Sequence, residues 1–320
     1  MATVPATAIP LAALAAGACG VGYAWLEARH FSLREFTIPV LPVGAGPLRV
    51  LHLSDLHLVP RQGRKQRWLA GLADLEPDLV VSTGDNLAAL DAVPAVLAAH
   101  GRLLERPGVF VLGSNDYFAP QFKSPARYLL RNGGKRRSHG RRLPSAELVQ
   151  GFTAAGWLDL TNRRGRLQVA GADLEFVGVD DPHLNYDRYD ETAGAADPDA
   201  TLTVGVTHAP YQRVLNAMSA DGAGLLLAGH THGGQLCLPG FGTLVTNCDV
   251  PRRQAKGVSR WPVNGAGAAS SDALSSSDAV SSSDAAWMHV SAGLGTAPSM
   301  AVRLACRPEA SLLTLVAKPT

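Results

Sequence analysis

Five short apolar runs of this chain are each followed closely by side chains that can bind a metal ion. Short β-prone runs bounded by polar residues and glycines are typical of buried strands. The runs and their polar residues are 48–53 with Asp55 and His57, 79–81 with Asp85, 109–112 with Asn115, 201–206 with His208, and 225–228 with His230 and His232. Helical patterns over 64–75 and 88–104 separate the first three runs and predict a parallel sheet flanked by helices. Because sites in open α/β sheets form beyond the carboxyl ends of the strands, we expect these side chains to meet.

The fifth run leads into residues 229–234, Gly-His-Thr-His-Gly-Gly, with two imidazoles one residue apart. Residues two positions apart in a strand face the same side, and the glycines allow backbone angles that turn both rings into one crevice. Neutral imidazole is the commonest metal ligand. By itself the motif is equally consistent with two surface histidines in a glycine-rich turn. The recurrence of ligand-type residues after the other runs favours metal binding.

The chemistry of the seven candidate ligands narrows the choice of metal. Carboxylate and amide oxygens combine with imidazole nitrogens and no thiolate joins them, a mixture that suits Mn, Fe or Zn better than a structural zinc site. This number of ligands is too large for one tetrahedral ion and suits two divalent metal ions that share a carboxylate. The alternatives are that Asp55 and Asp85 cap the following helices and that His208 is a hydrogen-bonded core histidine. Only the set as a whole favours ligation.

Taken in order, these blocks resemble the motifs of the calcineurin-like metallophosphoesterase family. The similarity covers about residues 48–235 and looks closest to the branch with an N-terminal hydrophobic anchor. The resemblance implies an α/β fold, a two-sheet αββα sandwich, preceded here by an N-terminal apolar helix. It also implies that Asp55, His57 and His232 hold one metal, that Asp85 bridges both metals, and that Asn115, His208 and His230 hold the second.

One block departs from the family pattern of Gly-Asn-His-Asp or Gly-Asn-His-Glu, because residues 113–116 here are Gly-Ser-Asn-Asp. Matched by length, Ser114 replaces the asparagine ligand. Matched by chemistry, Asn115 is the ligand and Asp116 takes the place of the histidine. We prefer the second alignment because an amide oxygen is a better ligand than a neutral hydroxyl. In either alignment the family's histidine, which helps to protonate the leaving group or steadies the phosphate, is missing.

Three residues are therefore candidates for catalysis beside the metal ligands. Asp116 stands where the family has its histidine, and Asn86 ends the Gly-Asp-Asn motif at 84–86. His183, which follows Asp-Asp-Pro at 180–182, is a candidate substitute for the missing proton donor. The alternative for His183 is an exposed loop histidine without a catalytic role.

The N-terminal region has the character of a membrane anchor. Residues 1–26 contain no charged side chain, and 9–26 form an Ala-, Gly- and Leu-rich run that ends near Tyr23 and Trp25. This run just reaches the roughly 20 residues that a membrane span needs, and tyrosine and tryptophan favour membrane interfaces. We expect membrane contact through residues 4–26. The alternative is an apolar helix packed on the domain.

We expect two parts, an anchor helix with its linker over 1–35 and a metallophosphoesterase domain over 36–320. Arg29 and Arg34 follow the apolar run and favour a cytoplasmic domain by the positive-inside rule. The segment 263–286 is rich in Ser, Asp and Ala, has little to bury, and is expected to be a disordered insertion. The β-prone runs at 287–290, 302–306 and 311–316 are expected to be closing strands of the same domain.

Charge and motifs together restrict the function. The chain has 29 Lys and Arg against 27 Asp and Glu, so nothing in its charge calls for nucleic acid as a partner. The expected function is hydrolysis of a phosphomonoester, phosphodiester or pyrophosphate bond in a phosphorylated small molecule or lipid, by water that two metal ions activate. One alternative is a scaffold that kept the fold and lost turnover, which the missing histidine favours. Another is a metal-dependent amide hydrolase, whose ligands would come in a different order.

Overall fold

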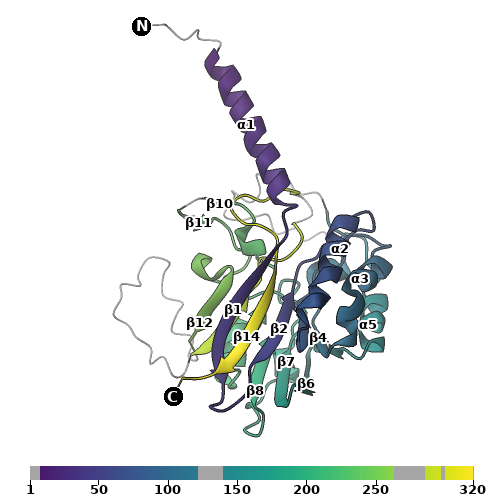
Figure 1. Ribbon diagram of the computed structural model, residues 1–320, viewed down its shortest axis with the longest axis vertical. Helices are drawn as coiled ribbons and strands as arrows, with labels where there is room; N and C mark the ends of the chain where they lie inside the picture. The colour runs from purple at the N-terminus through teal and green to yellow at the C-terminus, as the bar shows by residue number, and fades with distance from the viewer. Residues whose placement is uncertain (1–7, 122–139, 239, 263–284, 297–299, 320) are drawn as a thin grey trace.

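Two six-stranded sheets face each other, and helices cover their outer sides (Figure 1). The computed structural model describes residues 8–121, 140–238, 240–262, 285–296 and 300–319, with side chains from residue 17 onward within these ranges. The α/β two-sheet sandwich expected from the sequence is confirmed.

The first sheet contains most of the strands from the N-terminal half of the chain. Its order is β1-β14-β2-β3-β4-β5, and neighbouring strands are parallel except β14 and β2. The bounds are β1 Ser32–Leu41, β2 Leu48–Leu53, β3 Leu79–Ser82, β4 Gly108–Phe110, β5 Leu158–Asp159 and β14 Glu309–Ala317. β3 and β4 are buried along their whole length, as expected for central parallel strands that are covered on both faces.

The second sheet has the order β12-β13-β9-β8-β7-β6, with four parallel central strands and an antiparallel strand at each edge. Its bounds are β6 Arg163–Val169, β7 Ala172–Gly178, β8 Leu202–Val206, β9 Leu225–Ala228, β12 Gly257–Trp261 and β13 Ala286–Val290. A separate short hairpin pairs β10, Cys237–Leu238, with β11, Gly242–Thr243. This hairpin follows β9 and the two histidines of the 229–234 motif.

Apolar side chains form the layers between these elements. Residues such as Val50, Phe176 and Leu313 fill the space between the two sheets. The helices are α2 Gly63–Gly71, α3 Val93–His100, α4 Ser114–Tyr117, α5 Ser145–Ala154 and α6 Gln212–Ala220, with 3₁₀ turns η1 Leu72–Leu75, η2 Gly101–Glu105, η4 Tyr189–Glu191, η5 His232–Gly234 and η6 Arg252–Gln254. α2, α3 and α5 pack on the first sheet, and α6 packs on the second. Burying each large apolar side chain stabilises this arrangement by about 1.5–3 kcal/mol.

Helix α1, Ala8–Glu27, projects from one end of the sandwich (Figure 1). Its last turn is attached to the domain: Ala24 and Glu27 are buried, and the Glu27 carboxylate accepts hydrogen bonds from the N–H groups of Ala305 and Cys306 at 3.0 and 2.9 Å. Within the part of the chain that the structure describes, no helix combines the length and hydropathy that a transmembrane span requires. The membrane anchor and the division at residue 35 stay predictions.

Two local expectations differ from the structure, and a third lies almost wholly outside the described residues. The helix expected over 88–104 begins only at Val93, because Pro94 fits the first turn of a helix, where no N–H is needed. The run 302–306 is a loop with one isolated bridge at Leu304, since the side chain of Arg303 is buried and bonds to nearby carbonyl groups. The expected disordered insertion at 263–286 lies outside the described residues except for its last two, and Ala286 already begins β13.

Glu27→Gln is expected to weaken the junction between α1 and the domain. The amide keeps one oxygen but turns an N–H group toward one of the two backbone donors, so the free energy of unfolding should fall by about 1–3 kcal/mol. Urea unfolding measures the change, and hydrogen exchange at Ala305 and Cys306 should become faster. Glu35→Gln, at an exposed position, is the control. Equal losses in both variants would contradict this account.

Candidate metal centre

The predicted ligands lie on loops whose backbone has an unusual conformation. Five of them have left-handed φ angles: Asp55 at 51°, His57 at 40°, Asp85 at 57°, His230 at 68° and His232 at 50°. Such angles cost roughly 1–3 kcal/mol each in residues other than glycine, and they persist only where the surroundings hold them. Backbone hydrogen bonds between neighbouring loops do this, for example from Asp55 N to Gly84 O and from His57 N to Asp85 O, both at 2.9 Å.

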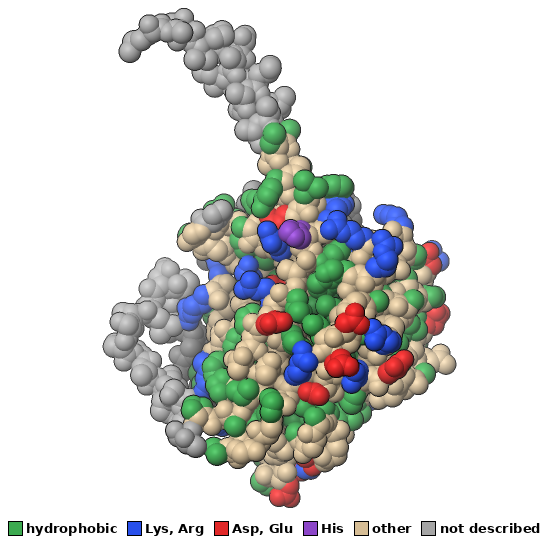
Figure 2. Space-filling view, viewed as in Figure 1, with side chains coloured by type: hydrophobic (Ala, Val, Ile, Leu, Met, Phe, Trp, Pro, Cys, Tyr) green, Lys and Arg blue, Asp and Glu red, His purple; other side chains and the backbone are tan. Residues whose placement is uncertain are grey.

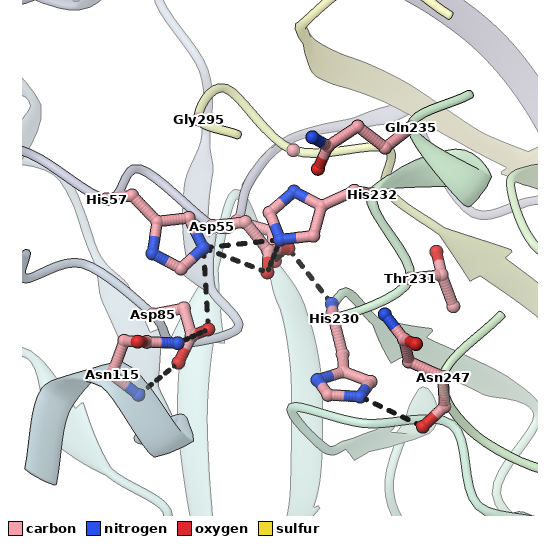
Figure 3. A network of polar contacts seen from close by, with 12 residues as sticks. Asp55, His57, Asp85, Asn115, His230, Thr231, His232, Gln235, Asn247 and Gly295 are labelled. Carbon is pink, nitrogen blue, oxygen red and sulfur yellow. Dashed lines mark hydrogen bonds and ion pairs between the residues drawn. The ribbon is translucent and has the colours of Figure 1, made fainter. Parts of the chain in front are cut away.

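The first group of ligands consists of Asp55, His57 and His232 (Figure 3). The Nε2 atoms of His57 and His232 are 3.2 Å apart, and Asp55 Oδ1 lies 3.9 and 3.6 Å from them. Asp55 Oδ2 accepts hydrogen bonds from Ser54 Oγ and His230 N, whereas the buried Oδ1 has no hydrogen-bond partner. Three ligand atoms therefore converge on one point, with an unsatisfied carboxylate oxygen among them.

Asp85 lies between this group and a second one, which consists of Asn115, His208 and His230. Its Oδ2 is 3.5 Å from His57 Nε2, and its Oδ1 is 3.5 Å from His208 Nε2. Asn115 contacts the same carboxylate: its backbone N–H donates to Oδ1 and its side-chain amide to Oδ2, both at 2.7 Å. Ser114 instead accepts a 3.4 Å hydrogen bond from the Asn115 amide. The structure thus places Asn115 against the shared carboxylate.

Hydrogen bonds to backbone carbonyls determine the tautomers of the histidines in the second group. His208 Nδ1 donates to Thr83 O at 2.7 Å, which leaves the lone pair of the neutral ring on Nε2. His230 Nε2 donates to Asn247 O at 3.4 Å, which leaves the lone pair on Nδ1. These two lone-pair nitrogens lie 3.3 Å apart, and His208 Nε2 is the one next to Asp85. Carbonyl groups behind metal-binding histidines commonly orient them in this way.

Burial keeps most of these imidazoles neutral. It lowers the pKa of His57 to about 4 and the pKa values of His230 and His232 well below their ordinary range. Burial would lower the pKa of His208 too, but the adjacent Asp85 carboxylate raises it well above the ordinary value. For Asp55, burial raises the pKa to about 6. The centre therefore offers neutral nitrogen ligands and a position beside Asp85 that favours positive charge.

These residues fit two divalent cations. Two carboxylates, Asp55 and Asp85, are buried in one site, an arrangement that opposes ionisation of both unless positive charge lies between them. Oxygen and nitrogen donors surround them, and a buried oxygen has no partner. Among the described residues there are two groups, in each of which the ligand atoms all lie within 4.8 Å of one another. The groups are Asp55, His57 and His232, and Asp55, Asp85 and His208.

Two of the three catalytic candidates instead support the loop that carries Asp85. The fully buried carboxylate of Asp116 accepts hydrogen bonds from the backbone N–H groups of Asp85, Asn86, Leu87 and Gly113 at 2.8–3.2 Å. Asn86 is also fully buried, and its side chain bonds to Ser82 and Asp116. Neither side chain is exposed to a substrate in this structure. Both side chains hold the loop of Asp85 in position, and the catalytic role expected from the sequence stays a prediction.

The third candidate, His183, lies at the metal centre. Its ring centroid is 4.5 Å from that of His230, and its Nδ1 is 3.1 Å from the Tyr211 hydroxyl. Its neighbour Asp181 was missed by sequence analysis. This carboxylate is buried, its Oδ2 has no partner, and burial raises its pKa to about 7 beside His208 and Asp85. The sequence contains a signal for Asp181, since Asp180 and Asp181 follow β7 just as the predicted ligands follow their strands.

The sequence pattern does not single out Arg303 either, because this residue lies in a run that is typical of a strand. Its guanidinium is fully buried and donates to the carbonyls of Ala292, Gly293 and Gly295 at 2.6–3.0 Å. It also lies 3.3 Å from His232 O and 3.4 Å from His232 Nδ1. Arg303 thus connects the loop between β13 and β14 to the predicted metal ligand His232. No local pattern marks a single arginine for this role.

Gly113→Ala is expected to disturb the metal centre without disturbing the fold. A Cβ at Gly113 would overlap Asp85 Oδ1 and His208 Cε1, so both ligands would have to shift. We expect reduced content of bound metal and a loss of about 1–3 kcal/mol in stability. Metal analysis and thermal unfolding measure the two effects. Gly46→Ala is the matched control, because a Cβ there meets nothing within 4 Å; unchanged metal content in Gly113→Ala would contradict the prediction.

Comparison with known proteins agrees with this geometry. The calcineurin-like phosphoesterase family matches residues 48–234. Two similar proteins come from Bacillus subtilis (strain 168). The uncharacterized protein YpbG is 28% identical over 225 residues, which cover 69% of this chain and 74% of that protein. The uncharacterized metallophosphoesterase YkuE is 27% identical over 254 residues, which cover 73% and 78%.

A third relative is a transmembrane protein with metallophosphoesterase domain from Danio rerio. It is 26% identical over 208 residues, which cover 63% of this chain but only 44% of that protein. Among solved structures, the 5'-nucleotidase precursor from Thermus thermophilus aligns with a TM-score of 0.41 and 12% identity, over 84% of this chain and 55% of that chain. Because the family match covers more than half of the 320 residues and includes all the predicted ligands, the chain belongs to the calcineurin-like phosphoesterase family and is a metal-dependent phosphoesterase.

Proposed function

We propose that this protein hydrolyses a phosphomonoester, phosphodiester or pyrophosphate bond with two divalent ions, Mn, Fe or Zn. Asp55, His57 and His232 would hold one ion, Asp85 would bridge both, and Asn115, His208 and His230 would hold the other. The observation that supports this most strongly is the position of Asp85, whose two oxygens each lie 3.5 Å from an imidazole nitrogen of a different group. One carboxylate facing two groups of ligands is the arrangement that a shared ligand needs.

The protein's own residues would prepare this site for phosphoryl transfer. Bound divalent ions supply neutralising charge for the phosphoryl oxygens and lower the pKa of water. Ser54 Oγ and His230 N hold one oxygen of Asp55, so the other stays directed at the ligands. Asp116 holds the loop of Asp85 through its backbone N–H groups. Phosphoryl transfer depends mainly on positioning and charge, so rigid ligands contribute directly to its rate.

His183 is our candidate for the general acid that donates a proton to the leaving group. Its ring lies against His230, so it borders the second group of ligands from the side of the 181–200 loop. The Tyr211 hydroxyl contacts its Nδ1 and so limits rotation of the ring. His183 would stand in for the histidine that the family has in the block occupied here by residues 113–116.

We further propose that the substrate is a phosphorylated lipid or a lipid-linked phosphate met at a membrane surface. The support is the N-terminal helix, where Val21, Tyr23 and Leu26 are 65%, 55% and 61% exposed. The relative from Danio rerio is named a transmembrane protein with metallophosphoesterase domain. Membrane contact through residues 4–26 and a cytoplasmic domain, favoured by Arg29 and Arg34, are parts of this proposal.

A scaffold without turnover is the competing proposal, favoured by the missing family histidine. A bis-aryl phosphate assay with Mn²⁺, together with metal analysis of the purified protein, separates the two. Turnover that depends on added metal supports the enzyme, and bound metal without turnover on a panel of phosphate esters supports the scaffold.

Asp85→Asn is expected to lower turnover by at least about a hundredfold, because metal ions contribute several kcal/mol of transition-state stabilisation. The variant removes the negative charge that both groups of ligands share. Rates with a bis-aryl phosphate and metal content measure the effect. Asp91→Asn, an exposed aspartate in the same connection between strands, is the matched control. A fully active Asp85→Asn protein would overturn the proposed site.

A further inference from the structure

Large apolar side chains are exposed on two neighbouring elements at one end of the molecule. We call them together the apical surface; its members are Val21, Tyr23, Trp25 and Leu26 of α1, and Leu238, Phe241 and Leu244 of the hairpin β10–β11 and its flank. Phe241 is 66% exposed, which is unusual for so large an apolar side chain. Soluble proteins rarely leave contiguous apolar patches uncovered unless the patch binds something.

One loop joins the two halves of the apical surface. Arg303 N donates to Ala24 O of α1 at 2.9 Å, and the Glu27 carboxylate accepts from Cys306 N. From the same loop, Leu304 O accepts a 2.9 Å hydrogen bond from Cys237 N of the hairpin. Helix and hairpin are therefore attached to consecutive residues of a single segment and lie on the same end of the domain (Figure 1).

The hairpin is also attached to the metal centre. It follows the ligand His232 by a few residues, and Thr243 Oγ1 donates to Gly233 O at 3.0 Å. The sulfur of Cys237 contacts the same carbonyl oxygen at 3.2 Å. A membrane in contact with the hairpin would therefore lie near the predicted ligands of the first group.

Exposed basic side chains lie on several segments next to the apical surface. The exposed cations on the adjoining segments are Arg61 before α2, Arg64 and Arg67 within α2, Arg252 and Arg253 in η6, Lys256 after η6, and Arg307 in the loop between β13 and β14. The only exposed carboxylate on the described parts of these segments is Asp249. Figure 2 shows Lys and Arg side chains gathered near the base of α1 on the face in view. On the described parts of these segments, seven exposed cations stand against one exposed carboxylate, so the segments carry an excess of positive charge.

Exposed Tyr, Trp and Phe side chains with cations on the neighbouring segments match the interface of a bilayer that contains anionic lipids. Aromatic rings favour the headgroup level, and each basic residue near an anionic surface adds attraction. A second copy of the chain is a poorer occupant, since a symmetric contact would bring like charges together. The charge of this end thus selects an anionic bilayer over self-association.

We propose that the hairpin β10–β11, together with the exposed side of α1, is a bilayer-contact surface that brings the metal centre to the level of the lipid phosphates. The inference deepens the proposed function and rests on it only for the substrate. It assigns membrane contact to Leu238, Phe241 and Leu244, far in sequence from the N-terminal helix.

A photoreactive benzoylphenylalanine at position 241 of the full chain tests this contact on vesicles with anionic lipid. Val43 is the matched control position, because it is likewise 66% exposed but lies in the turn between β1 and β2 at the other end of the domain. We expect lipid adducts at position 241 in at least about tenfold excess over position 43. Equal yields at both positions, or protein–protein adducts in place of lipid adducts, would overturn the proposal.

Charge-reversal variants test the role of the cations next to the apical surface. Arg252→Glu with Arg253→Glu should lower the adduct yield at position 241 several-fold on anionic vesicles, and Lys318→Glu, just after β14, should leave it unchanged. An unchanged yield in the double variant would exclude the role of these cations. Hydrolysis of a soluble bis-aryl phosphate, measured in parallel, reports on the metal centre alone. Lipid adducts without hydrolysis would therefore reject the proposed phosphoesterase activity and support the bilayer contact. Hydrolysis without lipid adducts would support the activity and reject the bilayer contact.

Discussion

The burial of two carboxylates, Asp55 and Asp85, is the constraint on which the rest of the centre depends. A buried carboxylate costs several kcal/mol unless hydrogen bonds or opposite charge compensate it. Ser54 and the backbone of His230 satisfy one oxygen of Asp55, and Asn115 bonds to both oxygens of Asp85. The two carboxylates still need compensating positive charge, and the space for it lies among the imidazoles. The loops around the strand ends are therefore organised to receive cations.

Two buried charged side chains hold these loops from opposite sides. The carboxylate of Asp116 gathers backbone N–H groups around Asp85, and the guanidinium of Arg303 gathers backbone carbonyls around His232. Each charge is compensated by oriented peptide dipoles, which makes its burial tolerable. The left-handed backbone of the ligands is stable in this setting because loops on both sides are fixed.

The metal centre and the apical surface share one end of the molecule for a structural reason. After the predicted ligand His232, the polypeptide forms the hairpin and later returns through the loop of Arg303, which also holds α1. In this loop, Arg303 donates hydrogen bonds both to Ala24 O of α1 and to His232 O. An event that moves α1 or the hairpin therefore acts on a segment that directly contacts a ligand.

The sequence by itself determined the order of strands and helices, the two-sheet class and the seven ligand-type residues at the strand ends. These follow from local patterns, because apolar runs predict strands and ligands of parallel sheets gather at one edge. Only the tertiary structure decided that Asp116 supports a loop, that Arg303 lies inside a run that reads as a strand, and that Asp181 faces His208. Their partners are backbone groups or distant side chains, and every residue carries the same backbone groups. Which of them meet depends on how the loops pack.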